Sequence, residues 1–559
     1  MSAIILAAIG LGTMFLGYRF YSKFIAEKIY RLDPDFETPS HTMQDDIDYV
    51  PTHKVVLWGH HFTAVAGAAP IIGPAIAIIW GWLPAFIWVV IGTTFFAGVH
   101  DFGAIWVSVR NRAKSVGSIT GDVVGLRARN LFMIVIFLLL LMVNAVFAVA
   151  ISEALVATPS SVIPLWAAVP LSVIVGLLIY KFQTSVLWPT VISTIILYVT
   201  VYIGDLFPLE LPERFLGLHP GPQWILILFV YALIASLLPV WSMLPPRGAI
   251  NGIQLFVGLA LVYGAIFIAN PKMVAPAINS APAGAPPIVP LLFVTIACGA
   301  ISGFHGLVSS GTTSKQLNKE TDARFVGYLG SVGEGALALA TIIATAAGFA
   351  SLSEWEVTYA RFGDGGIAAF AQGGARILGN GLGIPLDFGL TLLTVMAVLF
   401  ASTTMDAGVR LQRYIVQEWG NIYGIPLLQN GYVATFVAVA ACLALAFGAG
   451  GVEGKGGMFI WPLFGTTNQL LAGLTLLLIS VMLVKLGRPS IYTMVPMVFV
   501  TTMSFFSALY QLWDLYTGGN YLLVALDIMI IIAAIFVMLE SFSTFWREKK
   551  ASAHGSVQD

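Results

Sequence analysis

Residues 58–74 read WGHHFTAVAGAAPIIGP, and this stretch decides the fold. It is apolar enough to lie inside a membrane, yet it contains three glycines and two prolines. Glycine and proline are the weakest helix formers. In the hydrocarbon of a bilayer, an interrupted backbone is tolerated only where it is buried in protein or lines a cavity. The stretch therefore predicts a membrane helix with an interruption that is buried in protein or lines a cavity.

The composition of the whole chain supports a membrane location. Of the 559 residues, 58% are hydrophobic and only 10% are charged, whereas a soluble domain has about 25% charged residues. The chain lacks the polar surface that it would need in water. It is predicted to be an all-α polytopic membrane protein whose surroundings are the lipid bilayer, and no nucleic-acid partner is expected. Its two cysteines, Cys298 and Cys442, lie in apolar runs and suggest neither a disulfide framework nor a metal–thiolate cluster.

Apolar runs of about 20 residues mark the candidate membrane spans. We count about fifteen, near 1–18, 57–80, 84–108, 131–157, 163–180, 186–204, 222–241, 252–269, 288–310, 323–350, 381–405, 430–449, 458–484, 493–513 and 520–546. With the N-terminus outside, 22 of the 27 lysines and arginines fall in inner connections. Because inner loops carry the excess of basic residues, the predicted topology has the N-terminus outside and the C-terminus in the cytoplasm.

A second glycine-interrupted span has the opposite direction. Residues 295–313 read TIACGAISGFHGLVSSGTT within the ninth span. Two interrupted helices of opposite direction, each heading five spans, indicate an inverted-repeat transporter of the LeuT type.

This pattern divides the chain into five parts. Residues 1–56 hold the first helix and a cytoplasmic connection, 57–204 the first repeat, and 205–287 two inserted spans. Residues 288–484 form the second repeat, and 485–559 hold two C-terminal spans and a short tail.

The interruptions are the predicted substrate site. Where a helix breaks, free N–H groups form a positive pole and free carbonyls a negative one, and these can hold a carboxylate and a cation. The backbone of Ala66, Gly67, Ala68, Gly299 and Gly303 is the candidate contributor. The alternative is that the glycines are close-packing points between helices.

Polar side chains near the interruptions are further candidates for substrate contacts. These are His305 in the ninth span and Thr467 and Asn468 in the thirteenth. The thirteenth span contains GTTNQ, whose neutral donors and acceptors can bind a substrate or join helices to one another.

A coupling ion is expected at hydroxyl or titratable groups. Ser402 and Thr403 are predicted to face the break in the second span and to offer oxygen ligands; alternatively, they bond back to the preceding helical turn. His60 and His61 are either a proton-handling pair or residues of the membrane interface. Asp101 is either a coupling carboxylate or an ion-pair partner of an arginine at 110 or 112.

Two other classes of site are disfavoured. The stretch SSGTTSK at 309–315 lacks the phosphate-loop spacing and a preceding strand, so nucleotide binding is rejected. No pair of the histidines shows a helical i, i+4 ligand spacing with a carboxylate, so zinc coordination is only a weak alternative and no metal ligand is assigned. No cofactor is expected beyond a coupling ion, H⁺ or Na⁺.

Four long motifs resemble the carbon starvation protein CstA family. They are WGHHFTAVAGAAPIIGPA (58–75), GVHDFGAIWVSVRNRAKSVG (98–117), ACGAISGFHGLVSSGTTSKQL (297–317) and WPLFGTTNQLLAG (461–473). The resemblance runs from about residue 49 to 485. There are two departures: the chain is shorter than the enterobacterial members, which have additional C-terminal spans, and His100 stands where the family pattern has glutamine. It implies an inner-membrane secondary transporter of the amino acid–polyamine–cation superfamily, linked to peptide uptake during carbon starvation or to pyruvate uptake with protons.

The sequence thus predicts a carrier, not an enzyme, that imports a peptide or a small carboxylate with an ion gradient. A channel would need a continuous polar lining or a charged ring, and a sensor would need a signalling domain. Neither feature is apparent, and the oligomeric state is not predicted.

Overall fold

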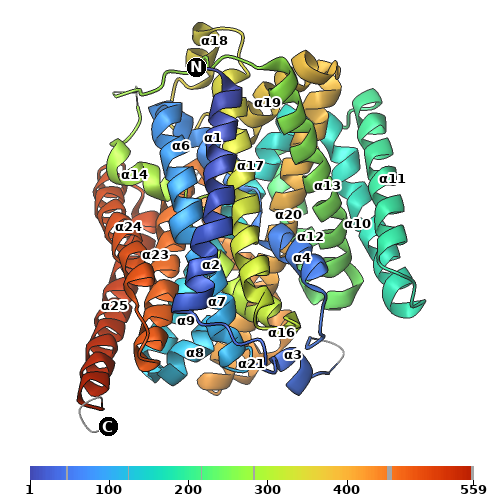
Figure 1. The fold of residues 1–559 in the computed structure, drawn as a ribbon. Helices are drawn as coiled ribbons and strands as arrows, with labels where there is room; N and C mark the ends of the chain where they lie inside the picture. Colours follow the sequence, from blue (N-terminus) through green and yellow to red (C-terminus); the bar gives the residue numbers. More distant parts are fainter. Residues whose placement is uncertain are drawn as a thin grey trace.

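The chain is a bundle of long helices in the computed structural model, which describes residues 1–45, 48–123, 125–215, 217–280, 282, 284–449 and 456–555 (Figure 1). Over these residues the only β contacts are three isolated bridges. The predicted all-α architecture is therefore confirmed for the described residues.

Among the residues that the structure describes, twelve helices are long and apolar enough to cross a membrane. They are Ala3–Ile29 (α1, η1, α2, η2), Trp82–Arg110 (α6, η4, α7), Leu126–Ala157 (α9), Pro159–Lys181 (η5, α10, η6), Leu187–Leu206 (α11), Pro220–Leu237 (α12), Trp241–Ala269 (in α13, Val240–Ala269), Arg324–Ala347 (η8, α17), Leu386–Ile422 (α20), Gly431–Gly448 (α22), Phe459–Lys485 (in α23, Gly456–Lys485) and Ile491–Thr517 (α24).

The two glycine-interrupted stretches are broken, as predicted. The first forms α4 (Lys54–Val65) and α5 (Ala69–Ala77), and the axis bends by 49° between Lys54–Val65 and Ala69–Trp80. The second forms α14 (Ile288–Thr295), α15 (Gly303–Val308) and η7 (Ser309–Thr313). At the end of the described chain, α25 (Tyr521–Gly555) begins with a shorter apolar stretch, Tyr521–Phe536.

Two parts of the fold differ from the predicted spans: a buried helix lies where no span was predicted, and another helix is longer than predicted. No span was predicted between residues 350 and 381, but the chain forms α18 (Leu352–Thr358) and α19 (Gly366–Leu382), and α19 packs on α20, α13, α5 and α17. Five glycines within α19 lower its helix propensity, so tertiary packing stabilises it. The span predicted at 381–405 is the longer α20, of 37 residues.

Three helices form the centre of the bundle. In the most apolar part of Phe459–Lys485, 94% of residues are buried, against 33% for Leu187–Leu206 at the periphery. The central helices α9 and α20 are each 83% buried by the same measure. A helix that is apolar all round belongs in such a core, so α9, α20 and α23 form the scaffold around the breaks.

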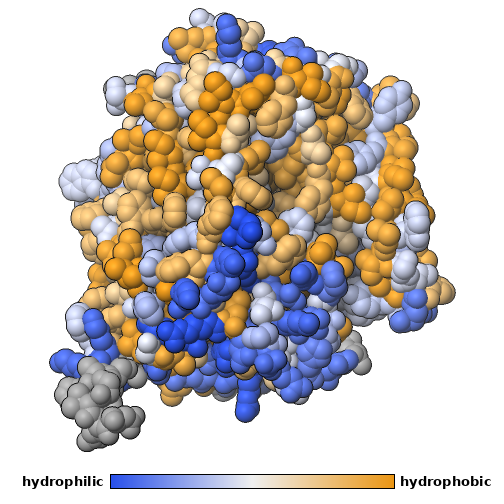
Figure 2. Space-filling view, in the orientation of Figure 1, coloured by the Kyte–Doolittle hydropathy of each residue, from blue (hydrophilic) through white to orange (hydrophobic). Residues whose placement is uncertain are grey.

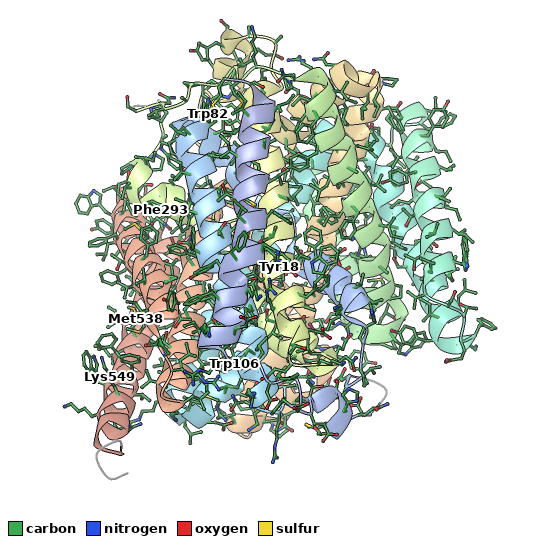
Figure 3. All side chains as sticks on the ribbon, in the orientation of Figure 1. Tyr18, Trp82, Trp106, Phe293, Met538 and Lys549 are labelled. Atoms are coloured by element: carbon green, nitrogen blue, oxygen red, sulfur yellow. The ribbon has the colours of Figure 1, made fainter. Side chains whose placement is uncertain are left out.

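The two chain ends lie at opposite ends of the bundle (Figure 1). The short helices α3 (Pro39–Thr42), α8 (Val116–Val123), α16 (Ser314–Gln316) and α21 (Pro426–Gln429) lie at the same end as the C-terminus. Hydrophobic residues cover most of the visible face, and hydrophilic residues gather towards this end (Figure 2). Trp82 and Trp106 lie towards opposite ends of α6–α7, and Lys549 lies near the C-terminal end of α25 (Figure 3).

Candidate functional site

The two broken helices touch each other at their interruptions. A Cβ on Gly73 of α5 would lie 2.5 Å from the carbonyl oxygen of Thr295, the last residue of α14. A Cβ on Gly299, between α14 and α15, would lie 3.5 Å from the Cβ of Pro70. Glycine at position 73 therefore allows the two backbones to approach closely, and Gly299 lies in van der Waals contact with Pro70.

The break between α4 and α5 is short. Ala66 leaves the helical conformation with φ −77° and ψ 68°. Gly67 donates its N–H to the carbonyl of Val65 at 2.9 Å, and α5 begins at Ala69. The space that a side chain on Gly67 would need is taken by Thr404 of α20, whose Oγ1 lies 2.7 Å from the ideal Cβ position. The predicted residues Ala66, Gly67 and Ala68 are buried and together form this break.

The break between α14 and α15 is longer, and side chains of the span Trp82–Arg110 (α6, η4, α7) satisfy part of its backbone. Trp88 donates its indole N–H to the carbonyl of Ile296 at 3.1 Å. Thr93 donates its hydroxyl to the carbonyl of Gly299 at 3.0 Å. These bonds meet the requirement that buried backbone groups be paired.

Polar residues of α23 satisfy another part of the same break. Asn468 accepts the N–H of Phe304 in the first turn of α15 at 3.0 Å, and it also bonds Ser302 at 3.0 Å. Gln469 donates to the carbonyl of Phe293 at 2.6 Å. The polar run in the thirteenth predicted span therefore joins helices, which is one of the two roles the sequence left open.

Two predicted residues near Asn468 also have structural contacts. Thr467 donates its hydroxyl to the carbonyl of Leu463 one turn earlier at 2.8 Å. A Cβ on Gly303 would lie 2.3 Å from the carbonyl oxygen of Asn468. Gly303 is thus a close-packing point between α15 and α23, the alternative that the sequence analysis kept open.

A buried cluster of titratable side chains lies beside the longer break. Asp101 of α7 accepts hydrogen bonds from His100 at 2.7 Å, from His305 at 2.9 Å and from Ser331 at 2.6 Å. The other ring nitrogen of His305 lies 3.3 Å from a carboxylate oxygen of Glu334 on α17. All five residues are at most 1% exposed. Charged and polar groups are costly in a membrane interior and are held there by one another.

The arginine pairing considered for Asp101 is wrong. Arg110 bonds Glu320 instead, through Nε at 2.5 Å and Nη2 at 2.8 Å. Since α7 places Asp101 more than two turns before Arg110, the carboxylate lies deeper and meets the histidines. The sequence singled out Asp101 and His305 separately, and only the packing of α7 against the broken helix brings them together.

The two adjacent histidines of α4 have different surroundings. His61 is fully buried and pairs with the hydroxyl of Thr313 at 2.9 Å. His60 is partly buried, and its ring lies 3.7 Å from the position of a Cβ on Gly248. The ring of His61 therefore packs among helices and not on the surface of the bundle.

The oxygen cage expected from Ser402 and Thr403 does not form at the break. Both side chains face α13: Ser402 accepts from the guanidinium of Arg247 at 2.6 Å, and Thr403 accepts from Asn251 at 2.7 Å. Both hydroxyls also donate to the carbonyl of Leu399, at 3.0 and 2.8 Å. The next residue, Thr404, is the one that faces the break, since a helix turns about 100° per residue. A guanidinium donating to Ser402 Oγ would also repel a cation there.

The same region holds a buried ion pair that the sequence did not predict. Arg247 hydrogen-bonds the carboxylate of Asp406 and the hydroxyl of Tyr231, and both charged side chains are at most 2% exposed. Arg410, one turn further along α20, does not take part in this pair and instead donates to backbone carbonyls of α12 and the turn after it. The nearest signal in the sequence was the presence of an arginine within an apolar run.

A cavity of about 440 Å³ opens beside α5 and α9. Ile72 of α5 and Glu153 of α9 line it, together with Arg361 and Asp364 of the segment before α19. Ile72 is one turn beyond the break between α4 and α5. The cavity therefore combines acidic and basic groups next to one broken helix.

Discontinuous helices that touch at their interruptions, inside a bundle of a dozen long apolar helices, define a class of membrane protein. This is the architecture that secondary transporters use to create a polar site in the bilayer.

The chain belongs to the carbon starvation protein CstA family, whose family model matches residues 2–353 and 349–508. The peptide transporter CstA of Campylobacter jejuni is 32% identical over 93% of this chain and 82% of its own length. The pyruvate/proton symporter BtsT of Escherichia coli K12 is 30% identical over 87% of this chain and 78% of its own length. A solved structure of the manganese transporter of Eremococcus coleocola aligns with 90% of this chain and 99% of its own, at 13% identity and a TM-score of 0.48.

Proposed function

We propose that this protein is a secondary active transporter that imports short peptides across the bacterial cytoplasmic membrane during carbon starvation, driven by an ion gradient. The observation that carries the proposal is the contact between the two interrupted helices at Gly73, Gly299 and Pro70. A relative of 32% identity carries the name peptide transporter CstA.

The proposed topology has two LeuT-like repeats and about fifteen spans. Besides the twelve long helices, the bent pair α4–α5, the interrupted segment 288–313 and α25 would supply three more. The first repeat would run from α4 to α11 and the second from α14 to α23, with α12 and α13 inserted. The excess of basic residues at one end favours an external N-terminus and a cytoplasmic C-terminus.

The proposed path leads from the cavity to the break between α4 and α5. A peptide in solution carries one ammonium and one carboxylate group. Glu153 and Asp364 are suited to the first, and Arg361 is suited to the second. The backbone of Ala66, Gly67 and Ala68 would then receive the peptide.

A second candidate is the uptake of pyruvate with protons, which the relatedness to the E. coli pyruvate/proton symporter favours. Pyruvate carries only a negative charge, so it would leave the acidic groups of the cavity without a partner. The charge pattern of the cavity therefore favours peptides.

Uptake into proteoliposomes separates these candidates. We expect a labelled di- or tripeptide to accumulate under an imposed proton or sodium gradient, and labelled pyruvate to compete weakly. Counterflow with unlabelled peptide inside should speed the entry of labelled peptide, which a pore would not do. Accumulation of pyruvate but of no peptide would replace the first candidate by the second, and absence of counterflow would reject the carrier.

Gly67→Leu is expected to abolish uptake while the protein still inserts into the membrane. The new side chain would collide with Thr404 within the break and fill the proposed peptide path. Gly264→Leu on α13 is a matched control, because no atom lies within 4 Å of its Cβ position. Uptake and membrane insertion are measured for both variants. Normal uptake by Gly67→Leu would contradict the assignment of the path.

A further inference from the structure

Three potential metal ligands converge beside the longer break, although they are far apart in the sequence. Cys298 lies between α14 and α15, His305 lies on α15, and Glu334 lies on α17. One ligand atom from each (a sulfur, a ring nitrogen and a carboxylate oxygen) lies within 4.8 Å of the others. The three residues are 7%, 0% and 1% exposed.

Two of these atoms face each other without a hydrogen bond. Nε2 of His305 and Oε1 of Glu334 are 3.3 Å apart, and neither has a hydrogen-bond partner despite its burial. The carboxylate of Asp101 can only accept, so Nδ1 of His305 is the nitrogen that donates to it. In the neutral imidazole, Nε2 then presents a lone pair to a carboxylate oxygen. A buried lone pair facing a carboxylate at 3.3 Å is costly, and a cation between the two atoms, either a proton or a metal ion, would remove the cost.

Each potential ligand also makes a hydrogen bond with a residue outside the group of three. Asp101 holds His305 at 2.9 Å, and the amide nitrogen of Asn468 donates to the sulfur of Cys298 at 3.1 Å. The backbone of Gly299 donates to the carboxylate of Glu334. Outer bonds of this kind orient metal ligands, and a carboxylate behind a histidine is the commonest of them.

We propose that Cys298 Sγ, His305 Nε2 and Glu334 Oε1 bind a divalent late transition metal of the zinc type. A thiolate, an imidazole and a carboxylate are all zinc ligands, whereas a thiolate does not suit magnesium or calcium. The two charges of the ion would balance the thiolate and the carboxylate. Three protein ligands leave one position of a tetrahedral ion for water or another donor. The alternative occupant is a proton shared by His305 and Glu334, but a proton would not account for the sulfur of Cys298 beside them.

The full-length protein, purified in detergent from zinc-supplemented cells, should contain about one zinc ion per chain by elemental analysis. Cys298→Ser and Glu334→Gln should each lose this metal, and Cys442→Ser, at a buried thiol on α22, should keep it. Asp101→Asn should weaken zinc affinity by about 10–100-fold, the usual effect of losing an outer partner of a ligand.

Cobalt gives a readout that does not depend on transport. Co²⁺ added to the metal-free protein should produce a thiolate-to-cobalt charge-transfer band, which Cys298→Ser abolishes and Cys442→Ser retains. If Cys298→Ser fails to fold, the band in the wild-type protein and its loss in Glu334→Gln still decide the matter. A wild-type protein without stoichiometric zinc or a cobalt band, or with metal that survives these substitutions, would overturn the proposal and leave the proton as the occupant.

Discussion

Replacing Arg247 by methionine should destabilise the protein by about 3–5 kcal/mol, because it leaves the carboxylate of Asp406 buried without its counter-charge. Arg247 bonds Asp406, Tyr231 and Ser402, which lie on α20 and α12. The substitution therefore removes the charged connection between these helices and α13. The free energy of unfolding in mixed detergent micelles measures the effect.

A second substitution separates the loss of the charge from the loss of the side chain. Arg247→Met combined with Asp406→Leu should recover most of the stability, since replacing both members of a buried pair by apolar residues is often neutral or stabilising. Lys114→Met, at an exposed pair with Asp122, should cost at most about 1 kcal/mol. A single Arg247→Met variant as stable as the wild type would show that the buried pair contributes nothing.

Gly299→Ala should abolish uptake and lower the free energy of unfolding by about 2–5 kcal/mol. Gly299 has φ +94°, a left-handed conformation that costs an L-residue about 1–2 kcal/mol. The new methyl group would also lie 2.7 Å from the Cβ of Ala338, and overpacking typically costs about 1–3 kcal/mol. Uptake in proteoliposomes and unfolding in detergent are both measured.

The two contributions at Gly299 can be separated. Adding Ala338→Gly should relieve the collision but not the backbone strain, so the double variant should recover only part of the lost stability. Gly311→Ala is the control, because nothing lies within 4 Å of its Cβ position and its φ is not left-handed. Wild-type stability of Gly299→Ala would mean that the break can relax without cost, contrary to its close contact with α17.

The sequence by itself was enough to identify the membrane class and the two interruptions. Both follow from local chemistry: twenty apolar residues match the thickness of a bilayer, and clustered glycine and proline end a helix wherever they occur. The family resemblance was also readable from the four motifs, and the match over residues 2–353 and 349–508 agrees with it. The glycine-rich helix α19 was missed because its stability comes from its neighbours and not from its own residues.

Only the tertiary structure decided which polar groups meet. A helix rotates each residue by about 100°, so one position separates Thr404, which faces the break, from Thr403, which faces α13. Likewise, Cys298, His305 and Glu334 come together because a broken helix packs against α17. A single sequence gives the spacing of residues along each helix, but it does not give the rotation and depth at which two helices pack. Those depend on the sum of many weak contacts across the whole bundle.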